Sequence, residues 1–313
     1  MQSVVEGLSA ISGRGACTDA ERRAALWLHD ELRSRGHEAW VETRWVRPQR
    51  YATVALGCLL AIAGGLLSTA AAAAGLAVAV AGALMLALEA AGFVPPLFPR
   101  RATQDVLVPP TGPAVPLVVA AAYDAPRDRW RRLLRPRWAL AACAVAVAGA
   151  AGARLGGVDA TWLGAVQLVP TVALLVAFAA AIDVAQSGFP PDSGSGAAVA
   201  LALFDELRRD PPRSLAPSLL LFGAGHAARR PRTDGIVLEL GPSGDGPPTW
   251  SAGHPQLRAA AARAAEELGY QGGGRAAGVR ITGGTAALDL ALGVVDALDA
   301  DLSATAPAAS RPA

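Results

Sequence analysis

The sequence has few of the residues that form covalent or metal cross-links. Its 313 residues include three cysteines and four histidines, and lysine is absent. Cys17, Cys58 and Cys143 lie far apart, which fits neither a disulfide framework nor a metal knuckle. Without lysine, glycine-rich stretches such as 272–274 cannot complete a Walker motif. These absences exclude disulfide-rich, zinc-knuckle and P-loop proteins.

Charge is also absent from a long stretch of the chain. No charged residue occurs from Ala52 to Leu88, a run that exceeds one membrane span of about 20 residues and suits two. The apolar fraction of 52% agrees with a membrane protein. We predict transmembrane helical hairpins at 51–95 and 137–183, of which the helix at 138–153 is the weakest candidate because it is short. The alternative is a soluble protein with buried, alanine-rich core helices.

Arginines set the expected orientation, because basic residues near span ends stay on the cytoplasmic side. They flank both hairpins on the side of the polar segments: Arg47, Arg50, Arg100, Arg101, Arg127, Arg129, Arg131, Arg132, Arg135 and Arg137. The loops inside the hairpins carry only Arg154. No signal peptide is expected, because residues 1–45 lack an apolar h-region. We therefore expect a multi-pass protein of the cell membrane with a cytoplasmic soluble domain.

The charge pattern also bears on partners. The net charge is only +2, and the arginines lie beside the predicted spans. The sequence therefore does not indicate the basic surface that a nucleic-acid-binding protein has. The lipid bilayer is the partner that the sequence indicates, and the cluster at 127–137 is expected to be either a topogenic loop or a site for anionic headgroups. Gly64, Gly65, Gly75 and Gly82 permit close helix packing within or between subunits, including a homo-oligomer.

The polar segments predict one α/β domain that the hairpins interrupt. Its parts are residues 1–50, 102–126 and 187–303, with a disordered tail expected at 304–313. Thr18 and Glu21 have capping-box spacing for a first helix that stops near Gly36. The uncharged stretch 116–123 suits a central strand. An edge strand is expected at 37–46, further strands at 218–223, 235–240 and 279–282, and further helices at 196–209, 257–269 and 285–302. The alternation predicts a mixed, mostly parallel sheet flanked by helices.

Short motifs in these segments resemble those of the di-zinc aminopeptidases, the metallopeptidase family that includes aminopeptidase Y and the bacterial leucyl aminopeptidases. Residues 13–25 are similar to the opening Arg-to-Glu helix motif of that family. The first metal strand of the family ends in Ala-His-Tyr-Asp, in which the His binds zinc and the Asp orients it. Here Ala121-Ala122-Tyr123-Asp124 keeps Asp124 and has Ala122 at the ligand position.

The later motifs are degenerate as well. Anchoring the Gly-Ala-Asp-Asp-x-x-Ser-Gly motif on Ser195 places Pro191 at the position that bridges the two zinc ions and Asp192 beside it. The Gly-Ala-Glu-Glu motif, which supplies the general base and a ligand, becomes Gly225 and His226 at its last two positions. Gly241 falls where a strand should end in a ligand Asp. The last ligand, a His, would fall within residues 284–287, which contain none.

The resemblance implies a zinc-exopeptidase-like fold without its chemistry. A di-zinc site needs a bridging carboxylate, further ligands on each metal and a separate general base. Among the aligned positions only His226 can bind zinc, and one imidazole cannot replace three or four ligands. We therefore expect no catalytic residue, no bound cofactor and a pseudopeptidase that acts as a binding or regulatory scaffold. Its pseudo-active cleft is the expected contact surface for a protein or peptide ligand.

Two alternatives stay open. In the first, the chain is an active metallo-aminopeptidase-like hydrolase that holds a single zinc ion on His226 with Asp192 or Glu239. In the second, it is a small transporter or channel component. The second alternative is disfavoured because transport pathways carry polar groups, whereas the spans contain only Glu89 and Asp183, near their ends.

Overall fold

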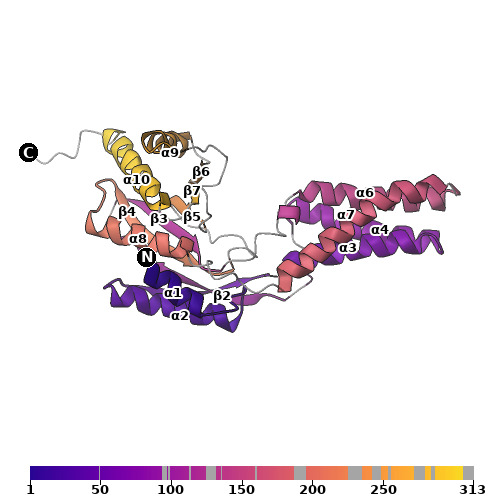
Figure 1. The fold of residues 1–313 in the computed structure, drawn as a ribbon, viewed down its shortest axis with the longest axis horizontal. Helices are drawn as coiled ribbons and strands as arrows, with labels where there is room; N and C mark the ends of the chain where they lie inside the picture. The colour runs from indigo at the N-terminus through magenta and orange to yellow at the C-terminus, as the bar shows by residue number, and fades with distance from the viewer. Residues whose placement is uncertain are drawn as a thin grey trace, which may run out of the picture. The chain divides into compact units, whose positions relative to one another are not determined.

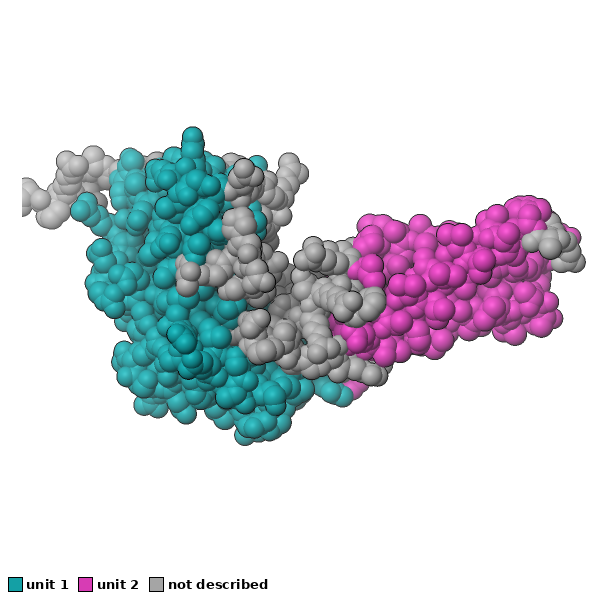
Figure 2. Space-filling model, viewed as in Figure 1, with its two compact units in different colours: residues 1–46, 101–125, 189–313 teal, residues 47–100, 126–188 magenta. Residues whose placement is uncertain are grey.

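The chain divides into two compact units, each described by itself (Figure 2). The α/β unit comprises Met1–Val46, Arg101–Ala125 and Phe189–Ala313, and the helical unit comprises Arg47–Arg100 and Pro126–Gly188. The computed structural model describes residues 1–48, 50–93, 97, 99–112, 114–124, 132–134, 136–158, 161–186, 195–224, 235–241, 248–252, 255–270, 279–282 and 286–305. The α/β unit is therefore built from three separate segments of the sequence.

A seven-stranded mixed sheet forms the centre of the described α/β unit (Figure 1). Its strands are β1 (Trp40–Val46), β2 (Arg101–Val108), β3 (Val115–Ala122), β4 (Leu215–Phe222), β5 (Ile236–Leu240), β6 (Thr249–Ala252) and β7 (Val279–Thr282). The order is β1-β2-β4-β3-β5-β7-β6. The four central strands run parallel, whereas β1, β2 and β6 pair antiparallel. The mixed sheet is confirmed, but its parallel part is confined to the centre.

Strand β3 has the predicted central position. Its residues pair with both β4 and β5, so that Val118 lies opposite Ser218 on one side and Val237 on the other. Side chains alternate between the two faces of a strand. Accordingly Leu117, Val119 and Ala121 enter the large core, and Val118 and Ala120 enter a smaller cluster made of strand residues. A strand this apolar is stable only when neighbours cover both of its edges and both of its faces.

The helices of this unit are α1 (Gln2–Ala10), α2 (Asp19–Ser34), α8 (Ser195–Arg209), α9 (Pro255–Glu267) and α10 (Ala286–Thr305). All five contribute residues to the large core, and none of their described residues belongs to the smaller strand cluster. They therefore cover one face of the sheet. Helix α2 begins with the predicted cap, since the Glu21 amide donates to Thr18 Oγ1 at 3.2 Å.

In this unit, helix α1, strand β2 and strand β6 have no counterpart among the elements expected from the sequence. Strand β2 carries charge, but Asp105 within it is only 3% exposed and is bound by Arg44. Strand β6 has four residues, too few for a periodic pattern.

The helical unit contains α3 (Arg50–Leu67), α4 (Ala72–Ala90), a short 3-10 helix η1 (Arg132–Leu134), α6 (Arg137–Leu155) and α7 (Thr161–Gln186). Among the described residues, three helices are long and apolar enough to cross a membrane: Ala72–Ala90, Arg137–Leu155 and Trp162–Val184. A shorter apolar helix spans Tyr51–Leu67. The helix expected at 138–153 extends over Arg137–Leu155, which makes it long enough to cross a membrane, although it is the least apolar of these three helices.

Glycines bring α3 and α4 into backbone contact. A Cβ atom on Gly64 would lie 2.2 Å from the amide nitrogen of Ala79, and one on Gly75 would lie 2.2 Å from that of Ser68. A Cβ on Gly82 would lie 2.5 Å from the nitrogen of Ala61. Any side chain here would push the helices apart. These glycines therefore serve packing inside this unit, as small residues do between membrane helices.

A polar contact joins α6 and α7 to the turn between α3 and α4. Arg154, in the last turn of α6, donates from Nη1 to Ser68 Oγ at 2.9 Å and to Gln167 Oε1 at 2.6 Å. Ser68 follows α3, and Gln167 lies in α7. Both acceptors are buried, at 3% and 8% exposure. Arg154, expected in a loop, instead ties α6 to its neighbours.

Candidate functional site

The aligned ligand positions that the structure describes lie at one edge of the sheet. Ala122 is the last residue of β3, and Gly241 directly follows β5. Because Ala121 pairs with Leu240 in the parallel β3–β5 ladder, Ala122 and Gly241 both come next at the carboxyl edge. Parallel α/β sheets bind ligands at this edge. Pro191, Asp192, Gly225 and His226 lie outside the described residues.

The backbone of α8 lies very close to the backbone at the end of β5. A Cβ on Gly196, the second residue of α8, would lie 2.8 Å from the carbonyl oxygen of Gly241. The Gly241 amide in turn donates to the carbonyl of Ile281 at 2.8 Å. Gly241 is therefore held by its backbone between α8 and β7. A side chain at position 196 would collide with the backbone of Gly241.

The aligned positions Ala122 and Gly241, which the structure describes, offer no ligand to a zinc ion. Ala122 and Gly241 have no side-chain donor, whereas zinc takes imidazole, thiolate or carboxylate ligands. Within the described ranges, no group of three or more His, Cys, Asp or Glu residues is arranged to hold a metal. Glu239, offered as a ligand in the active-enzyme alternative, lies inside β5 between Ala120 and Arg280.

The same edge instead carries a buried polar group that we call the Glu21 cluster. It is centred on the Glu21 carboxylate, which is 1% exposed. Its members come from the residues before and in α2, from β1 and β2, and from the ends of β3 and β4: Arg14, Cys17, Glu21, Arg44, Thr103, Asp105, Tyr123, Asp124, Gly223 and Ala224. The sequence pattern predicts for Glu21 only a capping-box position at the start of a helix.

Three donors converge on Glu21. Oε2 accepts from the Cys17 amide at 2.6 Å, and Oε1 accepts from the Ala224 amide at 2.6 Å and from Thr103 Oγ1 at 2.9 Å. In an ordinary capping box the carboxylate would return to the amide of the cap, here Thr18. It binds Cys17 and Ala224 instead. The start of α2 is thereby fixed to the carboxyl end of β4.

The backbone is strained at both amides. Cys17 has φ of 60° and Ala224 has φ of 49°, and they are the two non-glycine residues with positive φ in the described chain. This left-handed conformation costs roughly 1–2 kcal/mol for a residue with a Cβ. Such strain persists only where the surroundings enforce it. Here both strained residues point their amides at the same carboxylate.

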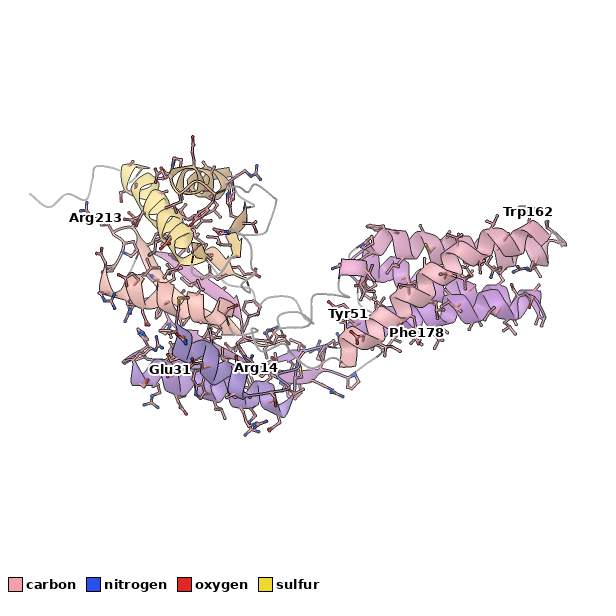
Figure 3. The ribbon with its side chains drawn as sticks, viewed as in Figure 1. Arg14, Glu31, Tyr51, Trp162, Phe178 and Arg213 are labelled. Carbon is pink, nitrogen blue, oxygen red and sulfur yellow. The ribbon has the colours of Figure 1, made fainter. Side chains whose placement is uncertain are left out.

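Two arginines and two further acids complete the cluster. Arg44 donates from Nε and Nη2 to the two carboxylate oxygens of Asp105 at 2.6 and 3.2 Å. Arg14 is 2% exposed, lies beside α2 (Figure 3) and donates to the carbonyl of Tyr123 at 3.2 Å. Its charge is attracted to that of Asp124, which is 2% exposed. The resemblance assigned Asp124 to orient a His, whereas here it faces a guanidinium.

Burial shifts the acid–base properties of the cluster. It raises the pKa of Glu21 to about 7, with the negative charge of Asp124 adding to the rise, while the hydrogen bonds from Thr103 and the two amides counter it. Burial and the nearby Glu21 raise the pKa of the Cys17 thiol to about 12. Since the thiolate is the reactive form, Cys17 is not a nucleophile at neutral pH. Burial also raises the pKa of Tyr123, whose hydroxyl donates to the Gln104 carbonyl at 2.6 Å.

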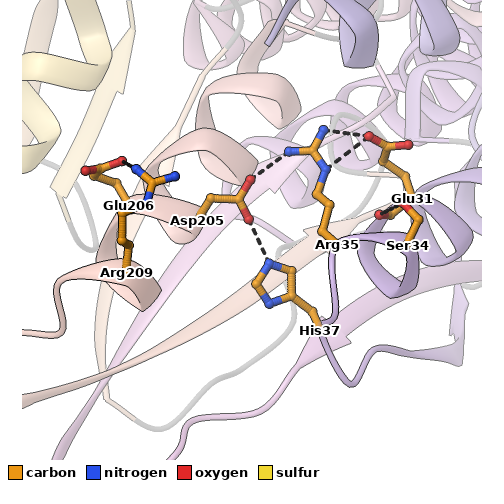
Figure 4. A network of polar contacts seen from close by, with 7 residues as sticks. All are labelled: Glu31, Ser34, Arg35, His37, Asp205, Glu206 and Arg209. Carbon is orange, nitrogen blue, oxygen red and sulfur yellow. Dashed lines mark hydrogen bonds and ion pairs between the residues drawn. The ribbon is translucent and has the colours of Figure 1, made fainter.

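A second polar network, shown in Figure 4, joins α2 to α8. Asp205 accepts from Arg35 Nη1 at 2.6 Å through one oxygen and contacts His37 Nε2 at 2.7 Å through the other. Arg35 also donates twice to Glu31. The His37 ring meets the Phe204 ring edge-on, with centroids 5.1 Å apart. The network connects residues 168 to 170 positions apart, which sequence spacing cannot reveal.

Comparisons of the chain with protein-family models, with curated proteins and with solved structures found no match.

Proposed function

We propose that this chain is a membrane-anchored, non-catalytic homologue of the di-zinc aminopeptidases that acts as a binding or regulatory scaffold. One observation carries the proposal. The ends of the adjacent parallel strands β3 and β5, where the family motifs would place a His and an Asp, hold Ala122 and Gly241. The backbone of α8 occupies the space next to Gly241. The mixed sheet and the motif order support the homology.

Membrane anchoring is supported by the helical unit. Its three apolar helices expose large side chains that lipid would cover. The most exposed include Trp138 and Trp162 at the starts of α6 and α7 (Trp162 is labelled in Figure 3), and Val169 and Leu84 along α7 and α4. Tryptophan is enriched at both membrane interfaces. We propose two hairpins, α3–α4 and α6–α7, with the α/β unit on the cytoplasmic side.

The ligand of such a scaffold would be a protein or peptide segment. Substrate recognition in a parallel sheet uses the carboxyl edge, and that edge persists after the metal ligands are lost. The bilayer is the second partner. Because Gly64, Gly75 and Gly82 are occupied by contacts within α3 and α4, a homo-oligomer would have to use other faces of the helical unit.

Zinc content and peptidase turnover test the central claim. We expect the full-length protein, purified in detergent, to contain far less than one zinc per chain and to hydrolyse no aminoacyl substrate. Stoichiometric zinc together with hydrolysis that a chelator abolishes would overturn it. The competing model of a rearranged site predicts further that His226→Ala eliminates an activity of the wild type.

The topology has its own test. Thr111→Cys lies in the exposed segment between β2 and β3, and Val158→Cys lies between α6 and α7. In cells that express the full chain, an impermeant maleimide added outside should label Val158→Cys, and label Thr111→Cys only after permeabilisation. The reverse pattern would place the α/β unit outside the cell.

A further inference from the structure

The Glu21 carboxylate is buried, and no cation of the described residues is bound to it. It is 1% exposed, and within the described ranges its oxygens accept only from two backbone amides and the Thr103 hydroxyl, all of them neutral donors. Asp124, itself 2% exposed, places a second acid nearby. When Glu21 is ionised, its negative charge is therefore held out of contact with water and beside a like charge, and protonation removes that charge. Burying an unpaired charge is costly.

We propose that the Glu21 cluster is a proton-dependent latch between α2 and the carboxyl end of β4, closed while Glu21 is protonated and released more readily when the proton is lost. The latch goes beyond the scaffold function and does not depend on it. Glu21 interacts electrostatically with Asp124 and Tyr123 after β3 and with Cys17 before α2, while Arg44 on β1 and Asp105 on β2 act on Tyr123, and Arg14 acts on Asp124. Arg101 also acts on Cys17 but is exposed to solvent.

The hydrogen bonds accommodate both protonation states. A carboxylate accepts from Thr103 Oγ1, whereas a carboxylic acid can donate to it, because a hydroxyl is both donor and acceptor. In both protonation states the Cys17 amide donates to Oε2 of Glu21 and the Ala224 amide donates to Oε1. Protonation therefore changes the charge of the closed junction without requiring new partners. The strain at Cys17 and Ala224 is released when the junction opens, which adds to the tendency to open.

The direction of the pH effect follows from the raised pKa of Glu21. Its ordinary value is 4.5 and its value in the closed junction is about 7. The closed state is therefore favoured most at low pH, and this advantage is lost as the pH rises from about 4.5 to about 7. If the open state has the ordinary pKa, the opening equilibrium increases roughly tenfold between pH 6 and pH 8.

Hydrogen exchange measured by mass spectrometry on the full-length protein in detergent tests the latch. After correction for intrinsic rates, peptides that contain Cys17 and Ala224 should exchange about tenfold faster at pH 8 than at pH 6 in the wild type, while peptides from α10 should not. Glu21→Gln should abolish this difference, and Glu42→Gln, at an exposed position on β1, should retain it. A wild type without the difference, or a Glu21→Gln variant that keeps it, would overturn the latch.

A second measurement uses only the wild type, so its result does not depend on whether the Glu21→Gln variant folds. Infrared or carbon NMR spectroscopy of protein carrying labelled glutamate carboxyls should show one glutamate that titrates between pH 6 and pH 8. If every glutamate outside the helical unit titrates below pH 6, Glu21 does not hold its proton near neutrality and the proposal fails.

Discussion

Gly223 and Glu21 are in such close contact that a Cβ on Gly223 would stand 2.3 Å from Glu21 Oε1. The same Cβ would lie 2.5 Å from Thr103 Oγ1 and 2.7 Å from the hydroxyl of Tyr123. Glycine is thus required at the end of β4 by lack of space, since Gly223 is not among the glycines with positive φ. The buried polar cluster can approach the sheet only because this residue has no side chain.

Gly223→Ala is expected to destabilise the α/β unit by about 2–3 kcal/mol, because the added methyl would separate Glu21 from its donors. Chemical denaturation followed by tryptophan fluorescence measures this loss. Gly112→Ala is the control, since Gly112 has φ of 98° but nothing lies within 4 Å of its Cβ position. That variant should cost only about 1 kcal/mol, from backbone strain. Equal losses would contradict the steric explanation.

Gly64→Val should disrupt the helical unit. Its side chain would collide with the backbone of α4 at Ala79 and force α3 and α4 apart, at a cost of about 1–3 kcal/mol. Thermal aggregation of the protein in detergent, scored by size-exclusion chromatography, reports this loss. Gly149→Val, on α6 with open space around its Cβ, should behave as the wild type. A Gly64→Val variant as stable as Gly149→Val would show that the α3–α4 contact is not close.

Asp205→Asn is expected to cost about 1–2 kcal/mol, because Asp205 holds both Arg35 and His37 while a quarter of its side chain is exposed to screening solvent. The midpoint of denaturation measures the effect. Glu206→Gln is a matched control from the next position of α8, where the exposed Glu206 side chain pairs with the exposed Arg209. It should change stability by less than about 0.5 kcal/mol. The prediction fails if the two variants are equivalent.

Arg154 and Gln167 are expected to be energetically coupled. A double-mutant cycle with Arg154→Leu and Gln167→Leu should yield a coupling energy of about 0.5–1.5 kcal/mol, as for hydrogen bonds between membrane helices. Unfolding in mixed micelles provides the four free energies. Additive effects of the two substitutions would mean that the contact does not hold α6 against α7.

Local patterns were sufficient for much of the fold. The uncharged run at 116–123 corresponds to β3, the expected strand 279–282 is β7, and Thr18 caps α2 as its spacing required. These features depend on residues within one turn or one strand. The edge strand expected at 37–46 corresponds to β1, at one end of the sheet. Strand β2 could not be predicted, because Asp105 makes it look polar until Arg44 neutralises it from β1.

The candidate site was predictable only in part. The motif positions at Ala122 and Gly241 were expected at strand ends, where the structure has them. The Glu21 cluster could not be foreseen, because its donors come from Cys17, Thr103 and Ala224, and the last of these is 203 positions from Glu21. Nor does the sequence mark Cys17 and Ala224 as left-handed, since neither is a glycine or an asparagine.

The position of β3 in the sheet constrains how the protein is made. Its neighbours β4 and β5 are both encoded after α6 and α7, so the ribosome synthesises the second pair of apolar helices while β3 still waits for its partners. Both helical pairs are therefore synthesised before the central strands of the sheet can pair with one another. If synthesis stopped after α7, β3 would lack both of its neighbouring strands. Its apolar residues would then be exposed to chaperones and proteases.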